Sequence, residues 1–149
     1  MLLGDHGADV IRVDPPGGPR WNTPANATWN RNKRSIVLDL KADADLQAAR
    51  NLIATADVVI ENFRPGVMER LGIGAGAMTA ANPRLVYCSL PGFGSDDPRA
   101  QVRAWEGVVG AATASYRASR ASAGKPVYTV IPYGSAYAAF LCAVTVAMR

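Results

Sequence analysis

Apolar and polar positions alternate with two different periods along the first ninety residues. Residues 8–14 alternate small or apolar side chains with polar ones, and residues 35–40, 58–60 and 85–90 are short runs rich in apolar side chains. Such runs, bounded by Pro, Gly or Asn, are typical of strands. Leu, Ile and Ala recur at helical spacing over residues 43–56. The chain is therefore predicted to alternate strands with helices.

Shorter helical patterns follow the first four strands. We expect a helical turn over residues 67–71, a short helix ending near Asn82, and two buried helices over residues 105–116 and 136–148. Residues 15–32 are rich in Asn, Pro and Trp and carry no periodicity, so they predict a loop. A loop of that length is usually functional or mobile.

The alternation predicts an α/β fold, a Rossmann-like parallel sheet with flanking helices. Residues 1–4 look like the tail of a helix whose preceding strand is absent, so we expect the sheet to lack its first strand. Residues 1–97 would form the Rossmann-like part and residues 98–149 a helical extension. Ligands bind beyond the carboxyl ends of strands in such sheets, which directs attention to residues 61–63 and 91–93.

Charge and composition narrow the classes of partner. The net charge is +4, from 16 basic and 12 acidic residues, but the basic residues are scattered. This argues against nucleic acid and favours a phosphate-bearing small molecule. We expect a cytoplasmic protein, since no leader or membrane-spanning stretch is visible. Cys88 and Cys142 lie in apolar surroundings without metal-like spacing, so we expect reduced core cysteines and no metal site.

The turn that follows the third strand carries the most informative chemistry. Asn62 and Phe63 follow the strand directly, where an amide and an aromatic ring could hold an adenine. Pro65 and Gly66 turn the chain, and Arg70 on the next helical turn could offer its guanidinium to a phosphate. The alternative is an ordinary turn, with Phe63 in the core and Arg70 solvated.

Other residues with reactive side chains give weaker evidence for a functional site. His6 has no metal-ligand cluster around it in the sequence, and residues 72–76 contain glycines that follow a helical turn instead of the strand a dinucleotide loop requires. Asp14 at a strand end lacks the glycine turn of a dehydrogenase. The serines lack a nucleophile elbow.

Four segments together resemble the family III CoA-transferases, also called the CaiB/BaiF family. These are residues 7–13, residues 32–41, residues 56–66 and residues 82–94, in that order and spacing. The family includes carnitine-CoA transferases, formyl-CoA transferases and α-methylacyl-CoA racemases. The resemblance is strong from residue 7 to residue 94 and looser afterwards.

The resemblance implies a large domain that binds coenzyme A or acyl-CoA and homodimers whose two chains interlock. The family's CoA contacts fall on Leu38, Asn62, Phe63 and Arg70, and Gly92 and Phe93 would line the acyl end. The family transfers CoA between carboxylic acids through one aspartate, a carboxylate nucleophile. The corresponding position falls on Tyr133, Gly134 or Ser135, and no acidic residue follows Glu106.

Three hypotheses remain open from the sequence. The first is a CoA-transferase homologue, and the second is a non-catalytic CoA-binding module or a partner subunit that lacks the nucleophile. The third and weakest is a racemase relative, which would need a histidine near the position where Trp105 and Glu106 stand. Ser135 is the residue nearest to the family aspartate. A serine nucleophile would need a general base that the sequence does not identify, so Ser135 is expected to be a helix N-cap.

Overall fold

Short strands and helices alternate along the chain, as the pattern of the sequence predicts. The computed structural model describes residues 1–19, 23–116, 123–128 and 131–149. The elements run in the order α1 (Leu2–Asp5), β1 (Val10–Asp14), α2 (Pro24–Asn30), β2 (Lys33–Val37), α3 (Asp43–Ala54), β3 (Val58–Glu61), α4 (Val67–Arg70), α5 (Ala75–Ala81), β4 (Val86–Ser89), α6 (Glu106–Ala112) and α7 (Tyr133–Ala147).

All strand pairing in the described residues is parallel. β1 pairs with β2 from Val10 opposite Lys33 onward, and β3 pairs with β4 from Val58 opposite Val86 to Glu61 opposite Ser89. The two pairs are separate two-stranded sheets, since the described residues form no hydrogen-bonded ladder between them. The prediction of parallel strands with flanking helices is confirmed, but the strands do not join into one sheet. Each pair therefore keeps open edges.

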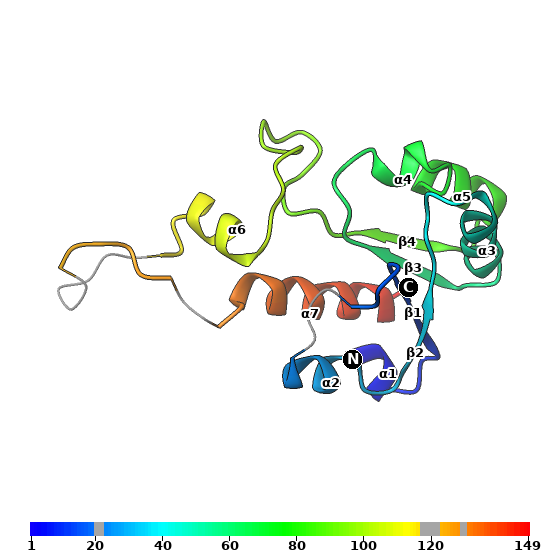
Figure 1. Cartoon of the computed structure of the whole chain (residues 1–149), viewed down its shortest axis with the longest axis horizontal. Coiled ribbons are helices and arrows are strands. Elements are labelled where there is room, and N and C mark those ends of the chain that lie inside the picture. The colour runs from blue at the N-terminus through cyan, green and yellow to red at the C-terminus, as the bar shows by residue number, and fades with distance from the viewer. Residues whose placement is uncertain (20–22, 117–122, 129–130) are drawn as a thin grey trace.

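The β3–β4 pair lies between two layers of helix (Figure 1). α4 and α5 cover one side of it, with α3 beside them, and α7 runs along the other side. α6 lies near the first turns of α7 and is reached from β4 by a long loop that projects away from the sheet. The carboxyl ends of β3 and β4 point toward this loop, so the loop borders the edge where a ligand is expected.

The predicted loop over residues 15–32 is wrong in its second half, because α2 forms there. Pro24 occupies its first turn and Thr23 the N-cap position, which is a common helix start. The side-chain amide of Asn30 donates to the carbonyl of Asn26 at 2.9 Å and supports the short helix. Hydrophobic periodicity gave no sign of α2, since none of its residues is buried.

Three other boundaries differ from the expected ones. β2 begins two residues early and stops at Val37, although Leu38 still donates its backbone N–H to the Asp14 carbonyl at 3.0 Å. α6 is shorter than predicted, and α7 begins at Tyr133 instead of residue 136. The early start of α7 places Ser135 inside the first turn, so its predicted role as N-cap is wrong; Pro132 occupies that position.

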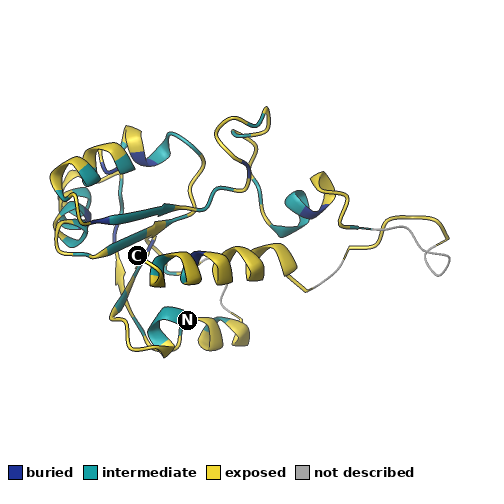
Figure 2. Ribbon diagram, turned by 180° about the vertical axis from the view of Figure 1, so that it is seen from behind, coloured by how far each residue is buried: buried dark blue, intermediate teal, exposed yellow. Residues whose placement is uncertain are grey.

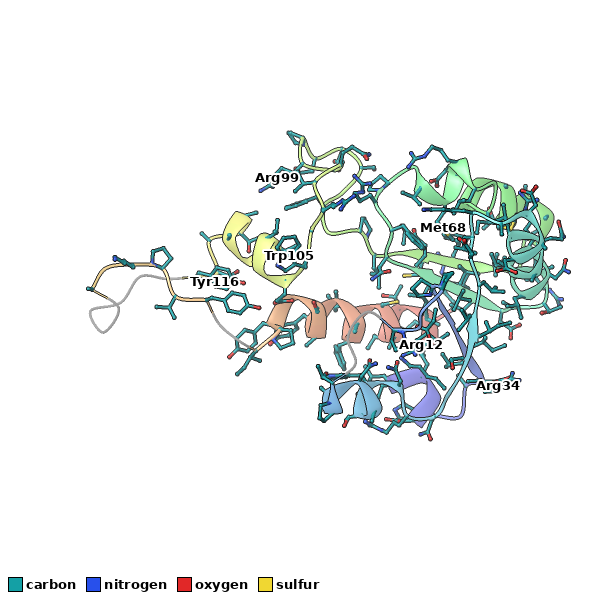
Figure 3. All side chains as sticks on the ribbon, in the orientation of Figure 1. Arg12, Arg34, Met68, Arg99, Trp105 and Tyr116 are labelled. Carbon is teal, nitrogen blue, oxygen red and sulfur yellow. The ribbon has the colours of Figure 1, made fainter. Side chains whose placement is uncertain are left out.

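The buried core lies where α3, α4 and α5 meet β4. Ile73, in the link between α4 and α5, is the most deeply buried large side chain described, with 1% of its surface exposed. Met68 on α4 is also buried and points toward the sheet (Figure 3). The Tyr87 hydroxyl donates to the Ile73 carbonyl at 3.1 Å, and burial raises the pKa of Tyr87 to about 12. This core fixes α4, and hence Arg70, against the strands.

α7 is apolar on most of its surface and yet largely exposed (Figure 2). Tyr137 and Leu141 are 67% and 61% exposed, and Cys142 is the one buried residue of the helix. An apolar helix of this kind normally packs against further protein. Within the described residues, no helix has both the length and the apolar character needed to cross a membrane.

Candidate functional site

The carboxyl ends of β3 and β4 are joined through one glutamate. Glu61 and Ser89 are opposite each other in the register, and the Ser89 hydroxyl donates to one oxygen of the Glu61 carboxylate. The other oxygen accepts the backbone N–H of Phe63 at 2.7 Å. Glu61 therefore turns the chain sharply after β3 and fixes where Asn62 and Phe63 lie.

Asn62 and Phe63 lie at this edge with their side chains accessible. Asn62 is exposed, and 41% of the surface of Phe63 is exposed. The sequence left open whether Phe63 is a core residue or a ligand contact. Its exposure leaves the ring available for stacking, and a flat exposed ring is the feature an adenine requires.

Arg70 folds back over the turn that follows Phe63. Gly66 caps α4 with a φ of 82°, a left-handed conformation that favours glycine. A Cβ added to Gly66 would lie 3.2 Å from a guanidinium nitrogen of Arg70, so the guanidinium lies against this turn. Within the described part of the chain, no carboxylate pairs with Arg70. Its donors are thus available to an anion close to Asn62 and Phe63.

The loop that follows β4 is tied to the same turn by two reciprocal hydrogen bonds. The Arg64 guanidinium donates to the backbone carbonyl of Gln101 at 3.0 Å, and the Gln101 side-chain amide donates to the backbone carbonyl of Pro65 at 3.2 Å. Residues far apart in sequence thereby form one surface around the ends of β3 and β4.

Gly92 and Phe93 lie at the start of this loop, and Gly92 is exposed to solvent. A Cβ added to Gly92 would stand 2.1 Å from the Cβ of Ala104, so only glycine fits there. Phe93 is buried, and the Arg99 guanidinium lies 4.6 Å from its ring centroid. Asp97 holds Arg99 in place through a 2.7 Å ion pair, and its hydrogen bonds with Arg99 lower the pKa of Asp97 to about 2.

Leu38 does not share this edge. It follows β2 in the other strand pair, and its side chain is buried. The structure therefore brings together Asn62, Phe63, Arg70, Gly92 and Phe93 around β3 and β4, and places Leu38 with the other strand pair.

Two surface hollows lie away from the predicted contacts. One of about 560 Å³ is lined mainly by α2 together with Arg12, and one of about 290 Å³ lies between α3 and α5. Neither includes a predicted CoA contact. In the described residues, no cluster of three or more His, Cys, Asp or Glu side chains is arranged to hold a metal ion. The candidate site is thus an open surface at a strand edge.

Glu106 contacts the position that the resemblance assigns to the catalytic aspartate. Its carboxylate accepts the backbone N–H groups of Gly134 at 2.7 Å and Ser135 at 2.8 Å, and the Ser135 hydroxyl at 2.6 Å. The hydroxyl of Ser135, together with these backbone groups, lowers the pKa of Glu106. The sequence identified no base near Ser135, and the structure places this carboxylate there. The contact joins α6 to α7, since Gly134 and Ser135 follow Glu106 by 28 and 29 positions in the sequence.

We expect Glu106→Gln to destabilise the chain by about 1 kcal/mol at neutral pH, as loss of a helix cap does. The folded-state pKa of Glu106 lies below its unfolded value, so its stabilisation is complete above the unfolded value, about 4.3. It is lost as the pH falls through the folded pKa. Urea midpoints should therefore differ between wild type and variant at pH 7 and converge as the pH falls through the folded-state pKa of Glu106.

Ser135→Ala is the matched variant, because it removes the hydroxyl and leaves both backbone donors in place. Its cost should be smaller than that of Glu106→Gln. An equal midpoint for wild type and Glu106→Gln at pH 7 would show that the carboxylate does not stabilise α7.

Comparison with known proteins identifies the family. The family model described as "CoA-transferase family III" matches residues 1–149. The chain belongs to this family. It is 44% identical over 153 residues to the CoA-transferase/lyase DddD of Marinomonas sp. (strain MWYL1), covering 99% of this chain and 18% of that protein. It is 40% identical over 118 residues to the acetyl-CoA:oxalate CoA-transferase of Acetobacter aceti, covering 72% of this chain and 30% of that protein.

The fold of this family III chain also matches a solved structure. The crystal structure of the hypothetical protein Rv3272 from Mycobacterium tuberculosis superposes with a TM-score of 0.87 at 35% identity, covering 99% of this chain and 44% of that one. The chain spans less than a third of the two curated relatives and less than half of this solved chain. The fold described above is therefore shared with that solved chain, while the activity of a whole protein is a matter for proposal.

Sequence reasoning missed three residues that shape the site. Glu61 fixes the turn, Gln101 ties the loop to it, and Arg99 covers Phe93. Gln101 acts on Pro65, which is distant in sequence, and the contact of Arg99 with Phe93 depends on how the loop folds, so no local pattern indicates either contact. Glu61 was visible at the end of β3, but its bond to Ser89 depends on the register of two strands.

Proposed function

We propose that this chain forms the coenzyme A-binding part of a family III CoA-transferase, with CoA at the carboxyl ends of β3 and β4. The observation that carries the proposal is the Arg70 guanidinium, which pairs with no carboxylate of the described residues and lies over the turn that presents Asn62 and Phe63. A cation, an amide and a half-exposed ring match the phosphates and the adenine of CoA. The net charge of +4 favours the same anionic ligand.

The described residues fit CoA at its nucleotide end better than at its acyl end. Asn62, Phe63 and Arg70 are accessible, whereas Phe93 is covered by Arg99 and Gly92 lies against Ala104. In this proposal Gly92 and Phe93 shape the wall of the site, and Leu38 is a further CoA contact contributed by the other strand pair. CoA or acyl-CoA is the substrate, and no metal takes part.

The catalytic step is the open part of the proposal. A CoA-transferase passes CoA through a thioester on an enzyme carboxylate, and a serine oxygen cannot form one. Tyr133, Gly134 and Ser135 are not acidic, so the second candidate is a CoA-binding module, or a subunit that works beside a chain supplying the nucleophile. Glu106 favours this candidate, because its carboxylate is engaged in hydrogen bonds to the backbone of Gly134 and Ser135 and so serves to hold α7 in place. The racemase alternative has Trp105 and Glu106 where a histidine is needed.

Replacing Arg70 with alanine tests the binding proposal. We expect CoA affinity, measured by calorimetry, to fall by about 1–3 kcal/mol, which is roughly a fivefold to 150-fold weaker Kd, because a charged hydrogen bond to phosphate is lost. Arg84→Ala is the control: Arg84 is also exposed but precedes β4, at the opposite end of that strand. An unchanged CoA affinity in Arg70→Ala would show that Arg70 is a solvated surface residue and does not contact CoA. A wild-type chain that does not bind CoA would overturn the proposal.

Trapping distinguishes the two candidates once CoA binding is established. The chain is mixed with an acyl-CoA and hydroxylamine, and mass spectrometry looks for a modified carboxylate. A trapped residue supports the transferase, whereas binding without a trapped residue supports the module or partner subunit.

We further propose that the chain works in the cytoplasm, within a dimer or beside a partner chain. The exposed apolar surface of α7 and the open strand edges of the described residues support a second copy or a partner chain. Residues 1–97 would supply the Rossmann-like CoA-binding part and residues 98–149 the helical extension that meets the partner.

A further inference from the structure

Two cysteines from distant parts of the chain meet between α7 and β4. The Sγ atoms of Cys88 and Cys142 are 3.3 Å apart, although the residues are 54 positions apart in sequence. Both are free thiols, Cys88 half-buried on β4 and Cys142 buried on α7. Cys142 is the one buried residue of α7, so the helix meets the sheet at this pair of thiols.

The geometry is close to that of a disulfide. A bond of about 2.05 Å requires the two sulfur atoms to approach by little more than an ångström. Side-chain rotation and a slight shift of α7 can supply that movement, because the residues around Cys142 on the helix are largely exposed. Burial raises the pKa of Cys142 to about 11, so the half-buried Cys88 is the thiol that meets a reagent first.

We propose that Cys88 and Cys142 form a reversible disulfide that fastens α7 to β4, made by exchange with a low-molecular-weight disulfide such as oxidised glutathione. The Cys88 thiolate attacks the small disulfide, forms a mixed disulfide and releases one thiolate. Cys142 then loses its proton to water and attacks the Cys88 sulfur, releasing the second thiolate. Two protein thiols are oxidised and one small disulfide is reduced to two thiols.

The bond would act on α7, the helix that carries Ser135 next to Glu106. β4 leads into Gly92 and Phe93, and α7 begins beside Glu106, so a bond between β4 and α7 fixes two walls of the same region. In a reducing compartment such bonds are transient and serve as redox-sensitive devices. The proposal is independent of CoA binding, because neither thiol belongs to the candidate contacts.

The test exposes the folded chain of residues 1–149 to oxidised glutathione and measures its mass under denaturing conditions. We expect a loss of two hydrogens, a cross-linked peptide joining Cys88 and Cys142, and a rise in the thermal midpoint of roughly 10 °C. Dithiothreitol should reverse all three. Cys142→Ser should stop at a glutathione adduct on Cys88, and Cys88→Ser should gain little adduct because Cys142 is buried.

Three outcomes would overturn the proposal. They are two free thiols after exposure of the folded chain, a cross-link between two chains, and a disulfide that forms only in denaturant. An unchanged thermal midpoint in the oxidised wild type would overturn the part of the proposal that the bond fastens α7 to β4. The double variant Cys88→Ser/Cys142→Ser controls for effects of the oxidant elsewhere.

Discussion

Ile73→Ala is expected to lower the free energy of unfolding by about 2–5 kcal/mol, because it removes three carbons from the most deeply buried large side chain described. Ile73 links α4 to α5, and its backbone N–H donates to the Met68 carbonyl at 3.0 Å. A cavity at this position weakens the packing of α4 against the core. The urea midpoint measures the effect, with Ile60→Ala as the matched control.

Ile60 has the same side chain but is 46% exposed on β3, so its truncation should cost less than about 1 kcal/mol. Equal losses for the two variants would show that the link between α4 and α5 is not a core position. CoA affinity measured on the remaining folded Ile73→Ala should fall only modestly, since Ile73 is a buried core residue and not one of the candidate CoA contacts.

Gly92→Ala is the second substitution with a large expected effect, about 1–3 kcal/mol of lost stability. The new methyl would lie 2.1 Å from the Cβ and 3.4 Å from the Cα of Ala104, so the loop after β4 must move. Ala104→Gly in the same molecule removes the nearer atom and should restore most of the loss. Urea midpoints of both single variants and the double variant measure the interaction.

Gly76→Ala is the control for the general effect of a methyl group on glycine. Gly76 is in the first turn of α5 with nothing within 4 Å of an added Cβ, so the change should be neutral or stabilising by up to about 1 kcal/mol. A double variant no more stable than Gly92→Ala would show that the clash with Ala104 is not the cause.

Local patterns predicted the elements near their observed positions wherever one face is apolar. β3, β4 and α3 have such faces, and their predicted limits agree with the structure to within two residues. α2 was missed because it buries no residue and leaves no apolar stripe to detect. The start of α7 was misplaced because Tyr133 and Gly134 precede its apolar stretch, and the contact of Glu106 with both Gly134 and Ser135 was not visible.

The candidate site was predictable in its strand ends and not in its side-chain contacts. Asn62 and Phe63 follow β3 directly, so the parallel arrangement alone placed them at the ligand edge. The burial of Phe93 under Arg99 depends on a loop that folds back, and residues in a loop carry no periodic signal. The roles of Arg70 and Ser135 rest on resemblance as well as geometry, and stay predictions until tested.

The ties between Arg64 and Gln101 have a consequence for how such a surface changes over evolution. Each side chain donates to a backbone carbonyl of the other segment, so neither bond depends on which side chain stands opposite. A lineage can therefore exchange one donor for another at position 64 without a compensating change at position 101. The loop and the turn can stay joined while their sequences drift one substitution at a time.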